Sequence, residues 1–95
     1  MRPATLLACL LAAASLPAAH AATKPTVLIT GANRGIGLEL VRQYAARDWK
    51  IIATARDAAG ATELQALAKS DPDIAVEQLD ITDHAGIDAL ATKYK

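Results

Sequence analysis

From residue 26 onward, short apolar runs alternate with longer segments in which apolar residues recur every three or four positions. The short runs are rich in β-branched residues and end near glycine, aspartate or proline, a pattern that predicts buried strands. Each longer segment has one apolar and one polar face, as an amphipathic helix does. We therefore expect strands at 26–30, 50–55 and 74–79, and helices at 35–48, 61–69 and 83–94.

The same spacing predicts which side chains of each helix face the core. These are Ile36, Leu40, Val41, Tyr44 and Ala45 in the first helix, Leu64, Leu67 and Ala68 in the second, and Ile87, Leu90, Ala91 and Tyr94 in the third. Charged and polar residues occupy the opposite face of the first helix, so we expect that helix to lie on the surface of a sheet.

Strands that alternate with helices predict βαβ units, a parallel sheet and helices on its faces. Right-handed crossovers then place the three strands side by side in the order 3-2-1. The predicted fold class is α/β, a Rossmann-type doubly wound parallel sheet of which this chain holds the first βαβαβα portion only. Because the first strand would lie at an open edge of a sheet that needs neighbours, we expect residues 22–95 to form part of a larger domain.

Residues 1–21 differ in character from the rest of the chain. Arg2 gives a positive start, an apolar stretch follows, and Ala19-His20-Ala21 places small residues at a signal-peptidase site. This order predicts a secretory signal peptide over residues 1–21, with cleavage between Ala21 and Ala22. The expected location is therefore periplasmic or secreted.

Two other interpretations of this leader are weaker. An uncleaved membrane anchor is disfavoured because the apolar stretch is short for a span and Pro17 interrupts it. The run Leu6-Leu7-Ala8-Cys9 is similar to a lipoprotein cleavage box, but only eight residues precede Cys9, too few for a full apolar region. We therefore expect no stable membrane span.

The charge balance and the cysteine count exclude several classes of partner. The chain has 10 Lys+Arg against 10 Asp+Glu, with the two signs interspersed, and so lacks the charge excess that nucleic acids attract. The single cysteine, Cys9, excludes an internal disulfide framework and a cysteine-based zinc site. His20 and His84 lie far apart with no neighbours at metal-ligand spacing, so no metal site is expected.

A glycine-rich segment, Thr30–Gly37, lies between the first predicted strand and the first predicted helix. Backbone N–H groups and the helix dipole converge at such a turn, which suits a phosphate group. We expect Gly31 to allow the sharp turn, Gly35 to allow close approach of a pyrophosphate, and Gly37 to allow close packing of helix on strand. A glycine cluster alone often marks only a tight turn, but this location favours dinucleotide binding.

The spacing Gly-x-x-x-Gly-x-Gly after Thr30 resembles the cofactor motif of the short-chain dehydrogenase/reductase family. The segments Thr54-Ala55-Arg56-Asp57 and Leu79-Asp80-Ile81-Thr82-Asp83, after the second and third strands, are similar to those of its carbonyl-reductase and C-factor-like members. The resemblance covers residues 26–95. It implies the predicted fold and a nicotinamide dinucleotide cofactor.

The resemblance also implies roles for individual residues. The pyrophosphate and ribose would be lined by Asn33, Arg34 and Ile36 beside Gly31, Gly35 and Gly37, while Asp80 would contact the adenine amino group with the Ile81 backbone beside it. Thr82 and Asp83 are also good N-cap residues for the third helix. The two roles of this segment are compatible, because Asp80 precedes the cap.

The end of the second strand selects between NAD and NADP. An acidic side chain there accepts the ribose 2′-hydroxyl of NAD and repels the 2′-phosphate of NADP. This chain has Ala55 in that place, followed by Arg56, and Arg34 lies next to the same pocket. Two guanidinium groups suit a phosphate. NADP is therefore the predicted cofactor, and nearby Asp57 would temper the preference.

In this family a Tyr-x-x-x-Lys motif and a Ser move the proton while hydride passes between the nicotinamide and a carbonyl or alcohol. Tyr44 is followed four residues later by Asp48, and Tyr94 only by Lys95, so we predict no catalytic residue in this stretch. The predicted function is that of an NADP-dependent oxidoreductase, here only its cofactor-binding part. A small-molecule carbonyl or alcohol substrate and a homo-oligomeric full-length form are expected.

Two alternatives stay open at this point. The resemblance to C-factor-like members also leaves open a non-catalytic nucleotide-binding or signalling module. The protein could also be cytoplasmic, because NADPH is made and kept in the cytoplasm and the leader lacks a twin-arginine signal.

Overall fold

The computed structural model describes residues 23–95. The predicted signal peptide over residues 1–21, its cleavage site before Ala22, and Cys9 and His20 lie outside the described residues. No helix within the described part is long and apolar enough to cross a membrane.

Strands and helices alternate along the described chain, as the apolar pattern predicts. The elements are β1 (Thr26–Ile29), α2 (Gly35–Ala46), β2 (Lys50–Ala55), α3 (Thr62–Ser70), β3 (Ile74–Gln78) and α4 (His84–Lys93). The predicted elements are all confirmed, and their ends differ from the expected ones by at most two residues, as is usual at the ends of helices and strands.

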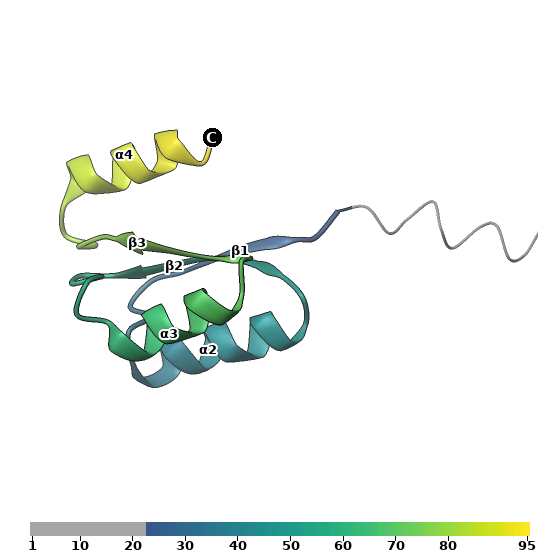
Figure 1. Cartoon of the computed structure of the whole chain (residues 1–95). Helices are drawn as coiled ribbons and strands as arrows, with labels where there is room; N and C mark the ends of the chain where they lie inside the picture. The colour runs from purple at the N-terminus through teal and green to yellow at the C-terminus, as the bar shows by residue number, and fades with distance from the viewer. Residues whose placement is uncertain (1–22) are drawn as a thin grey trace, which may run out of the picture.

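The three strands form one parallel sheet in the order β1-β2-β3, which confirms the expected order. Thr26 pairs with Lys50, and Ile51 pairs with Ile74. Helices α2 and α3 cover one face of the sheet and α4 lies over the other (Figure 1). The arrangement is the βαβαβα portion of a Rossmann-type doubly wound fold.

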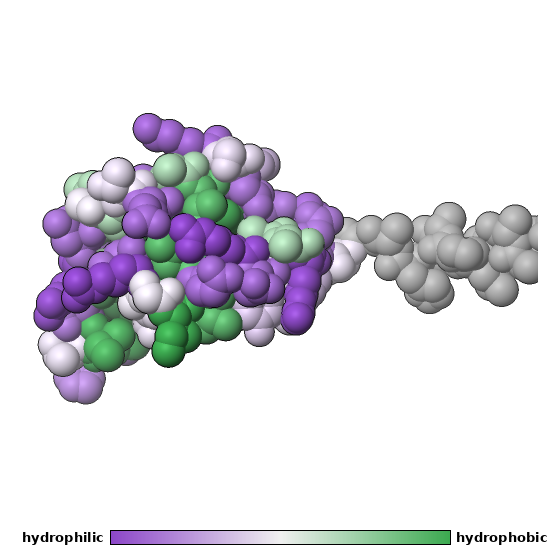
Figure 2. Space-filling view, turned by 90° about the horizontal axis from the view of Figure 1, so that it is seen from below, coloured by the Kyte–Doolittle hydropathy of each residue, from purple (hydrophilic) through white to green (hydrophobic). Residues whose placement is uncertain are grey.

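The core lies between the sheet and the α2–α3 layer. Alternate residues of β2 face it, namely Ile51, Ala53 and Ala55, all of them buried. Leu64 of α3 is fully buried beside them, and a leucine in such a place contributes about 2 kcal/mol. Hydrophilic side chains predominate on the outer surface of this layer, with hydrophobic ones between them (Figure 2). The α2–α3 layer therefore presents a mixed, mainly hydrophilic surface.

The predicted inward face of the first helix is partly wrong. Val41 is buried as expected, but the second fully inward residue is Leu38 rather than Leu40. Ile36 is 82% exposed and Leu40 is 41% exposed. The helix is rotated because Gly37 lies against the turn that follows β1, where a Cβ would collide with the carbonyl oxygen of Gly31. That contact turns Leu38 and Val41 toward the core.

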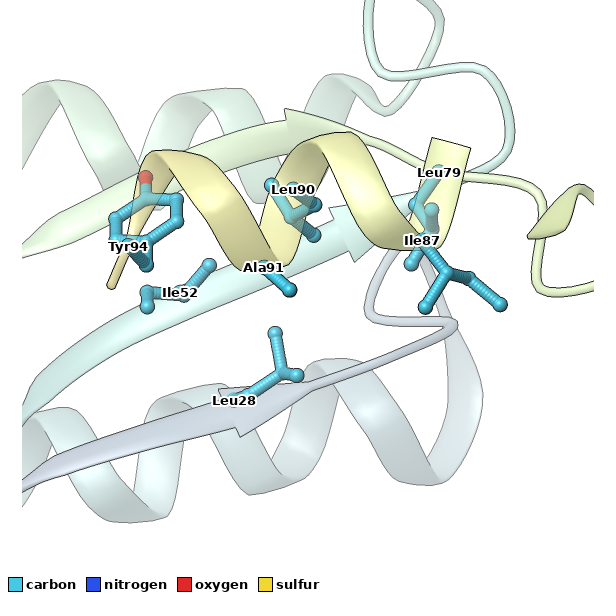
Figure 3. Close-up of a pocket in the computed structure, with 7 residues that line it drawn as sticks. All are labelled: Leu28, Ile52, Leu79, Ile87, Leu90, Ala91 and Tyr94. Carbon is cyan, nitrogen blue, oxygen red and sulfur yellow. The ribbon is translucent and has the colours of Figure 1, made fainter. Parts of the chain in front are cut away.

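The opposite face of the sheet is covered more loosely. The predicted inward residues of α4 do face the sheet, but none of them is fully buried, and Leu28 of β1 remains 54% exposed. A hollow of about 150 Å³ separates the two layers (Figure 3). Its lining is apolar apart from one tyrosine: Leu28, Ile52 and Leu79 of the sheet, with Ile87, Leu90, Ala91 and Tyr94. This face therefore offers apolar surface that the described residues do not cover.

One carboxylate fastens α4 to the sheet. Oε2 of Glu77 on β3 accepts hydrogen bonds from Nζ of Lys93 at 2.6 Å and from the hydroxyl of Tyr94 at 2.5 Å. The Lys93 ammonium, and then the Tyr94 hydroxyl, hold the pKa of Glu77 below its ordinary 4.5. Glu77, with partial burial, raises the pKa of Tyr94 from 10.0 to about 12. The last turn of α4 is thus held by polar contacts more than by apolar packing.

A second polar contact ties together the beginnings of the strands. Nζ of Lys24 lies 2.6 Å from Oδ2 of Asp73, just before β3, and 3.0 Å from Oδ1 of Asp48, just before β2. Asp73, and then Asp48, raise the pKa of Lys24 above its ordinary value. Asp48 has a φ of 65°, which aspartate tolerates in a tight turn. Lys24 therefore belongs to the folded domain although it precedes β1.

We predict that Glu77→Gln loosens α4 in the whole protein. Removing the charge weakens both contacts, which at this partly exposed site contribute about 1–2 kcal/mol. Amide hydrogen exchange in α4 should speed up by about tenfold. Glu63→Gln is the matched control, because it removes the charge of one of the two carboxylates that pair with Arg42 on the opposite face and should leave α4 unchanged. Equal exchange in wild type and Glu77→Gln would contradict the prediction.

The pH dependence of this contact follows from the two shifted groups. The lowered pKa of Glu77 makes its contribution present above about pH 4.5 and lost as the pH falls through the folded-state value. The raised pKa of Tyr94 makes its contribution present below pH 10 and lost as the pH rises through about 12. Protection of α4, corrected for intrinsic exchange, should therefore be highest between these limits.

We also predict that residues 22–95, produced alone, do not unfold cooperatively. The open face on the α4 side leaves too little apolar burial to offset chain entropy in so short a segment. A thermal scan followed by circular dichroism should show a broad, shallow change. A sharp transition that is independent of protein concentration would overturn this expectation.

Candidate functional site

A hollow of about 580 Å³ lies at the carboxyl ends of the strands. Its lining comes from the three segments that follow the strands: Thr30, Gly31, Asn33 and Arg34 after β1, Arg56, Asp57, Gly60 and Ala61 after β2, and Leu79, Asp80, Ile81 and Thr82 after β3. The carboxyl ends of parallel strands meet at one edge of a sheet, which is where doubly wound folds place their ligands.

The first wall is the glycine-rich turn. Gly31 and Gly35 have φ values of 60° and 59°, a region that side chains with a Cβ rarely adopt. The N–H of Ala32 donates to the carbonyl of Thr54 at 2.8 Å, which fixes the turn against the end of β2. The turn is therefore rigid and held in a conformation that requires glycine.

The turn leads into a helix end with unsatisfied donors. The N-cap residue of α2, Arg34, makes no side-chain capping bond, and the first turn of the helix carries no acidic residue. The free N–H groups and the positive end of the helix dipole therefore lie directly after Arg34, which lines the hollow, without a compensating charge from their own helix. This is the usual environment of a bound phosphate.

Two arginines from different segments line the same hollow. Arg34 follows β1 and Arg56 follows β2, and neither forms a salt bridge within residues 23–95. Their guanidinium groups are thus available for an anionic ligand. Ala55, which precedes Arg56, is buried in the core and does not line the hollow. Arg56 is therefore the first side chain after β2 that borders it.

The third wall holds an ionised carboxylate. Oδ1 of Asp80 accepts two hydrogen bonds from Thr82, one from its hydroxyl at 2.7 Å and one from its backbone N–H at 2.9 Å. These bonds, with a smaller contribution from the charge of Arg56, hold the pKa of Asp80 below its ordinary value. No described residue bonds to Oδ2. The carboxylate therefore has capacity to accept hydrogen bonds from a ligand.

The structure brings together most of the residues that the sequence pointed to. Gly31, Asn33, Arg34, Arg56, Asp80 and Ile81 all line the hollow, whereas Gly35, Ile36 and Gly37 do not. Gly35 and Gly37 instead shape the turn and its contact with α2, and Ile36 lies exposed on the helix. Their predicted contact with a pyrophosphate stays a prediction.

Six lining residues were not among the predicted site residues: Thr30, Asp57, Gly60, Ala61, Leu79 and Thr82. Gly60 could have been predicted from the sequence, because Asp57-x-x-Gly60 is a typical turn sequence just after a strand. Oδ1 of Asp57 accepts a hydrogen bond from the N–H of Gly60 at 3.1 Å. The turn thereby folds back and adds a second wall to the hollow.

Neither tyrosine of the chain borders the hollow. Tyr44 packs edge-to-face on Trp49 with ring centroids 4.8 Å apart, and Tyr94 is bonded to Glu77. The raised pKa of Tyr94 keeps its hydroxyl protonated at neutral pH. Within residues 23–95, no group of His, Cys, Asp and Glu side chains could hold a metal ion.

Comparison with known proteins agrees with this geometry. The family model of short chain dehydrogenases matches residues 25–95. The (+)-neomenthol dehydrogenase of Arabidopsis thaliana is 41% identical over 69 residues, which cover 67% of this chain and 23% of that protein. The chain spans about a quarter of the length of the curated relatives that it matches.

Solved structures show the same portion of the fold. The carbonyl reductase Sniffer of D. melanogaster superposes with a TM-score of 0.70 at 31% identity, covering 76% of this chain and 30% of that one. A Burkholderia multivorans structure with bound NADP, assigned to the short-chain dehydrogenases/reductases, gives a TM-score of 0.68 at 40% identity, covering 75% and 31%. Fold, motif positions and relatives therefore agree, and the chain belongs to the short-chain dehydrogenase family of oxidoreductases.

Proposed function

We propose that the whole protein is an NADP-dependent oxidoreductase and that residues 22–95 are a partial NADP-binding domain. The observation that carries this proposal is the convergence of Arg34 and Arg56 on one hollow beside a glycine turn. A nicotinamide dinucleotide with a 2′-phosphate is a ligand that needs both features: a site for pyrophosphate and a separate site for a dianion.

The pyrophosphate would bind at the N-terminus of α2. The uncapped N–H groups there and the positive φ of Gly31 and Gly35 support this placement. Asn33 borders the same turn and would donate from its amide. Ile36, exposed on the first turn of α2, would offer an apolar contact to the ribose.

The 2′-phosphate would bind between Arg34 and Arg56. A guanidinium group presents donors in a planar fork that matches phosphate oxygens, and two such groups together favour a dianion over a hydroxyl. The small, buried Ala55 leaves no acidic group at the position that would accept the 2′-hydroxyl of NAD. These features support NADP over NAD.

The adenine would lie against the third wall. Asp80 is ionised and has an oxygen that no described residue uses, so it would accept a hydrogen bond from the adenine amino group. Ile81 is 63% exposed and borders the same place, and its backbone would contact the ring. The two hydrogen bonds from Thr82 fix the orientation of the Asp80 carboxylate.

When bound, the nicotinamide supplies or accepts a hydride. Relatives named as (+)-neomenthol dehydrogenase, (-)-isopiperitenone reductase and carbonyl reductase support a small-molecule alcohol or carbonyl substrate. Because Tyr44 and Tyr94 lie away from the hollow, the proton would be moved by groups outside residues 23–95. A homo-oligomeric full-length form also stays a prediction.

We further propose that the protein is exported and that its leader is removed between Ala21 and Ala22. The contacts of Lys24 with Asp48 and Asp73 support this boundary, because cleavage there leaves Lys24 within the mature domain. The composition of the leader favours a periplasmic or secreted protein over a cytoplasmic one.

The cofactor preference is tested by Arg56→Ala in the whole protein. We expect NADPH binding to weaken by about 1.5–3 kcal/mol, as for the loss of a hydrogen bond between charged groups, while NADH binding changes little. Titration of both nucleotides, followed by nicotinamide fluorescence, measures the two affinities. Arg47→Ala, at the other end of α2, is the control and should bind both as wild type does. Equal losses for NADPH and NADH in Arg56→Ala would contradict the proposal.

The location is tested by amino-terminal sequencing of the protein recovered from fractionated cells. We expect a mature chain that begins Ala22-Thr23-Lys24 in the exported fraction, because the leader has the order of a cleaved signal peptide. Replacing Ala21 by a bulky residue should block processing. A protein that retains Met1 and stays in the cytoplasm would show the location to be wrong.

A further inference from the structure

The carboxylate of Asp57 faces the backbone of its own turn. Oδ1 accepts the N–H of Gly60 at 3.1 Å, and Oδ2 lies so close above Gly60 that a Cβ at that position would collide with it. The Asp57 carboxylate can therefore contact the backbone of the turn only because Gly60 has no side chain. Both residues border the hollow on the side of Arg56.

Further hydrogen bonds fasten this turn to α3. The side-chain amide of Gln65 donates to the carbonyl of Ala58 at 2.9 Å. The N–H of Ala61 donates to the same carbonyl at 3.2 Å, and the N–H of Thr62 donates to the carbonyl of Gly60 at 2.9 Å. Ala61 is buried in the core. The turn is thus a fixed wall of the hollow that begins at Arg56.

Asp57 would affect the binding of a phosphate in the hollow in two opposite ways. Its negative charge would weaken binding by repulsion, whereas its hydrogen bond to Gly60 would strengthen binding by holding the turn. Repulsion between two solvent-exposed charges is screened and changes an affinity by about fivefold or less. Loss of a hydrogen bond to a charged acceptor shifts an equilibrium by about tenfold or more. The hydrogen bond is therefore expected to be the larger effect at this position.

We propose that Asp57 is a positioning residue which, through its turn with Gly60, directs Arg56 toward the 2′-phosphate and so sets the preference for NADPH over NADH. This inference rests on the proposed function. It reverses the role expected of an acidic residue next to Arg56, which would be to weaken NADP binding. In this structure the carboxylate is used by its own turn.

The chain provides a matched control for this motif. Asp83-x-x-Gly86 repeats the spacing at the start of α4, and a Cβ at Gly86 would lie 2.9 Å from Oδ2 of Asp83. Asp83 and Gly86 do not line the hollow. The Asp83 side chain makes no capping hydrogen bond to α4, so changes at this second pair test substitution of the same residue types at the same spacing, away from the proposed cofactor site.

Three variants of the whole protein separate the charge of Asp57 from its turn. Asp57→Asn keeps an oxygen that accepts the N–H of Gly60 but removes the charge. Gly60→Ala keeps the charge but displaces the carboxylate, and Asp57→Ala removes both. Asp83→Ala and Gly86→Ala are the controls. Binding of NADPH and of NADH is titrated for each variant, and thermal unfolding is followed in parallel.

We expect Asp57→Ala and Gly60→Ala each to weaken NADPH binding by about tenfold and NADH binding by less than about threefold. Asp57→Asn should stay within about threefold of wild type for both nucleotides, and the two controls should bind as wild type does. The loss of NADPH affinity would then be caused by disruption of the turn and not by removal of the Asp57 charge. Because Gly60→Ala and Asp57→Ala disturb the turn in different ways, one folded variant of the two is enough for the test.

Other outcomes overturn the inference in distinguishable ways. Tighter NADPH binding in both Asp57→Asn and Asp57→Ala would show that Asp57 acts only by repulsion. Equal losses for NADPH and NADH with a lower melting temperature would show a merely structural role. A wild type without preference for NADPH would overturn the proposed function together with this inference. A wild type that prefers NADPH, with the same preference in Asp57→Ala and Gly60→Ala, would overturn this inference alone.

Discussion

The arrangement of this domain depends on one close backbone contact. The first turn of α2 lies so near the end of β1 that a Cβ on Gly37 would collide with the carbonyl oxygen of Gly31. The contact fixes the rotation of the helix, so that Leu38 and Val41 enter the core. It also directs the uncapped end of the helix toward the hollow at the strand ends. The same contact therefore determines both the packing of α2 in the core and the position of its N-terminus at the candidate site.

Each wall of the hollow is held by a contact of its own. The N–H of Ala32 is bonded to the end of β2, Asp57 binds the backbone of its turn, and Asp80 is bonded to Thr82. The parallel pairing of the strands sets the spacing between these walls. Loops held in this way on rigid strand ends can change their side chains without changing the sheet, which is how one fold accommodates different ligands.

Much of this could be predicted from the sequence, because the signals are local. Strand and helix periods differ, so six elements and their order follow from the spacing of apolar residues. In a parallel sheet, every segment that follows a strand reaches the same edge. One shared site was therefore expected for the polar residues that follow the three strands, including Arg34, Arg56 and Asp80. The hollow that these residues line agrees with that expectation.

The tertiary structure alone decided what depends on distances between segments far apart in the chain. Helix α2 has apolar residues on two overlapping faces, one with Ile36 and Leu40 and one with Leu38 and Val41. Either face could have packed on the sheet. The contact of Gly37 with Gly31 selected the face of Leu38 and Val41. The contacts of Lys24 with Asp48 and Asp73 likewise join positions that no local pattern relates. Gly60 entered the wall of the hollow because the Asp57 carboxylate bends the chain back. Spacing specifies which residues can face one another, whereas steric fit specifies which of them do.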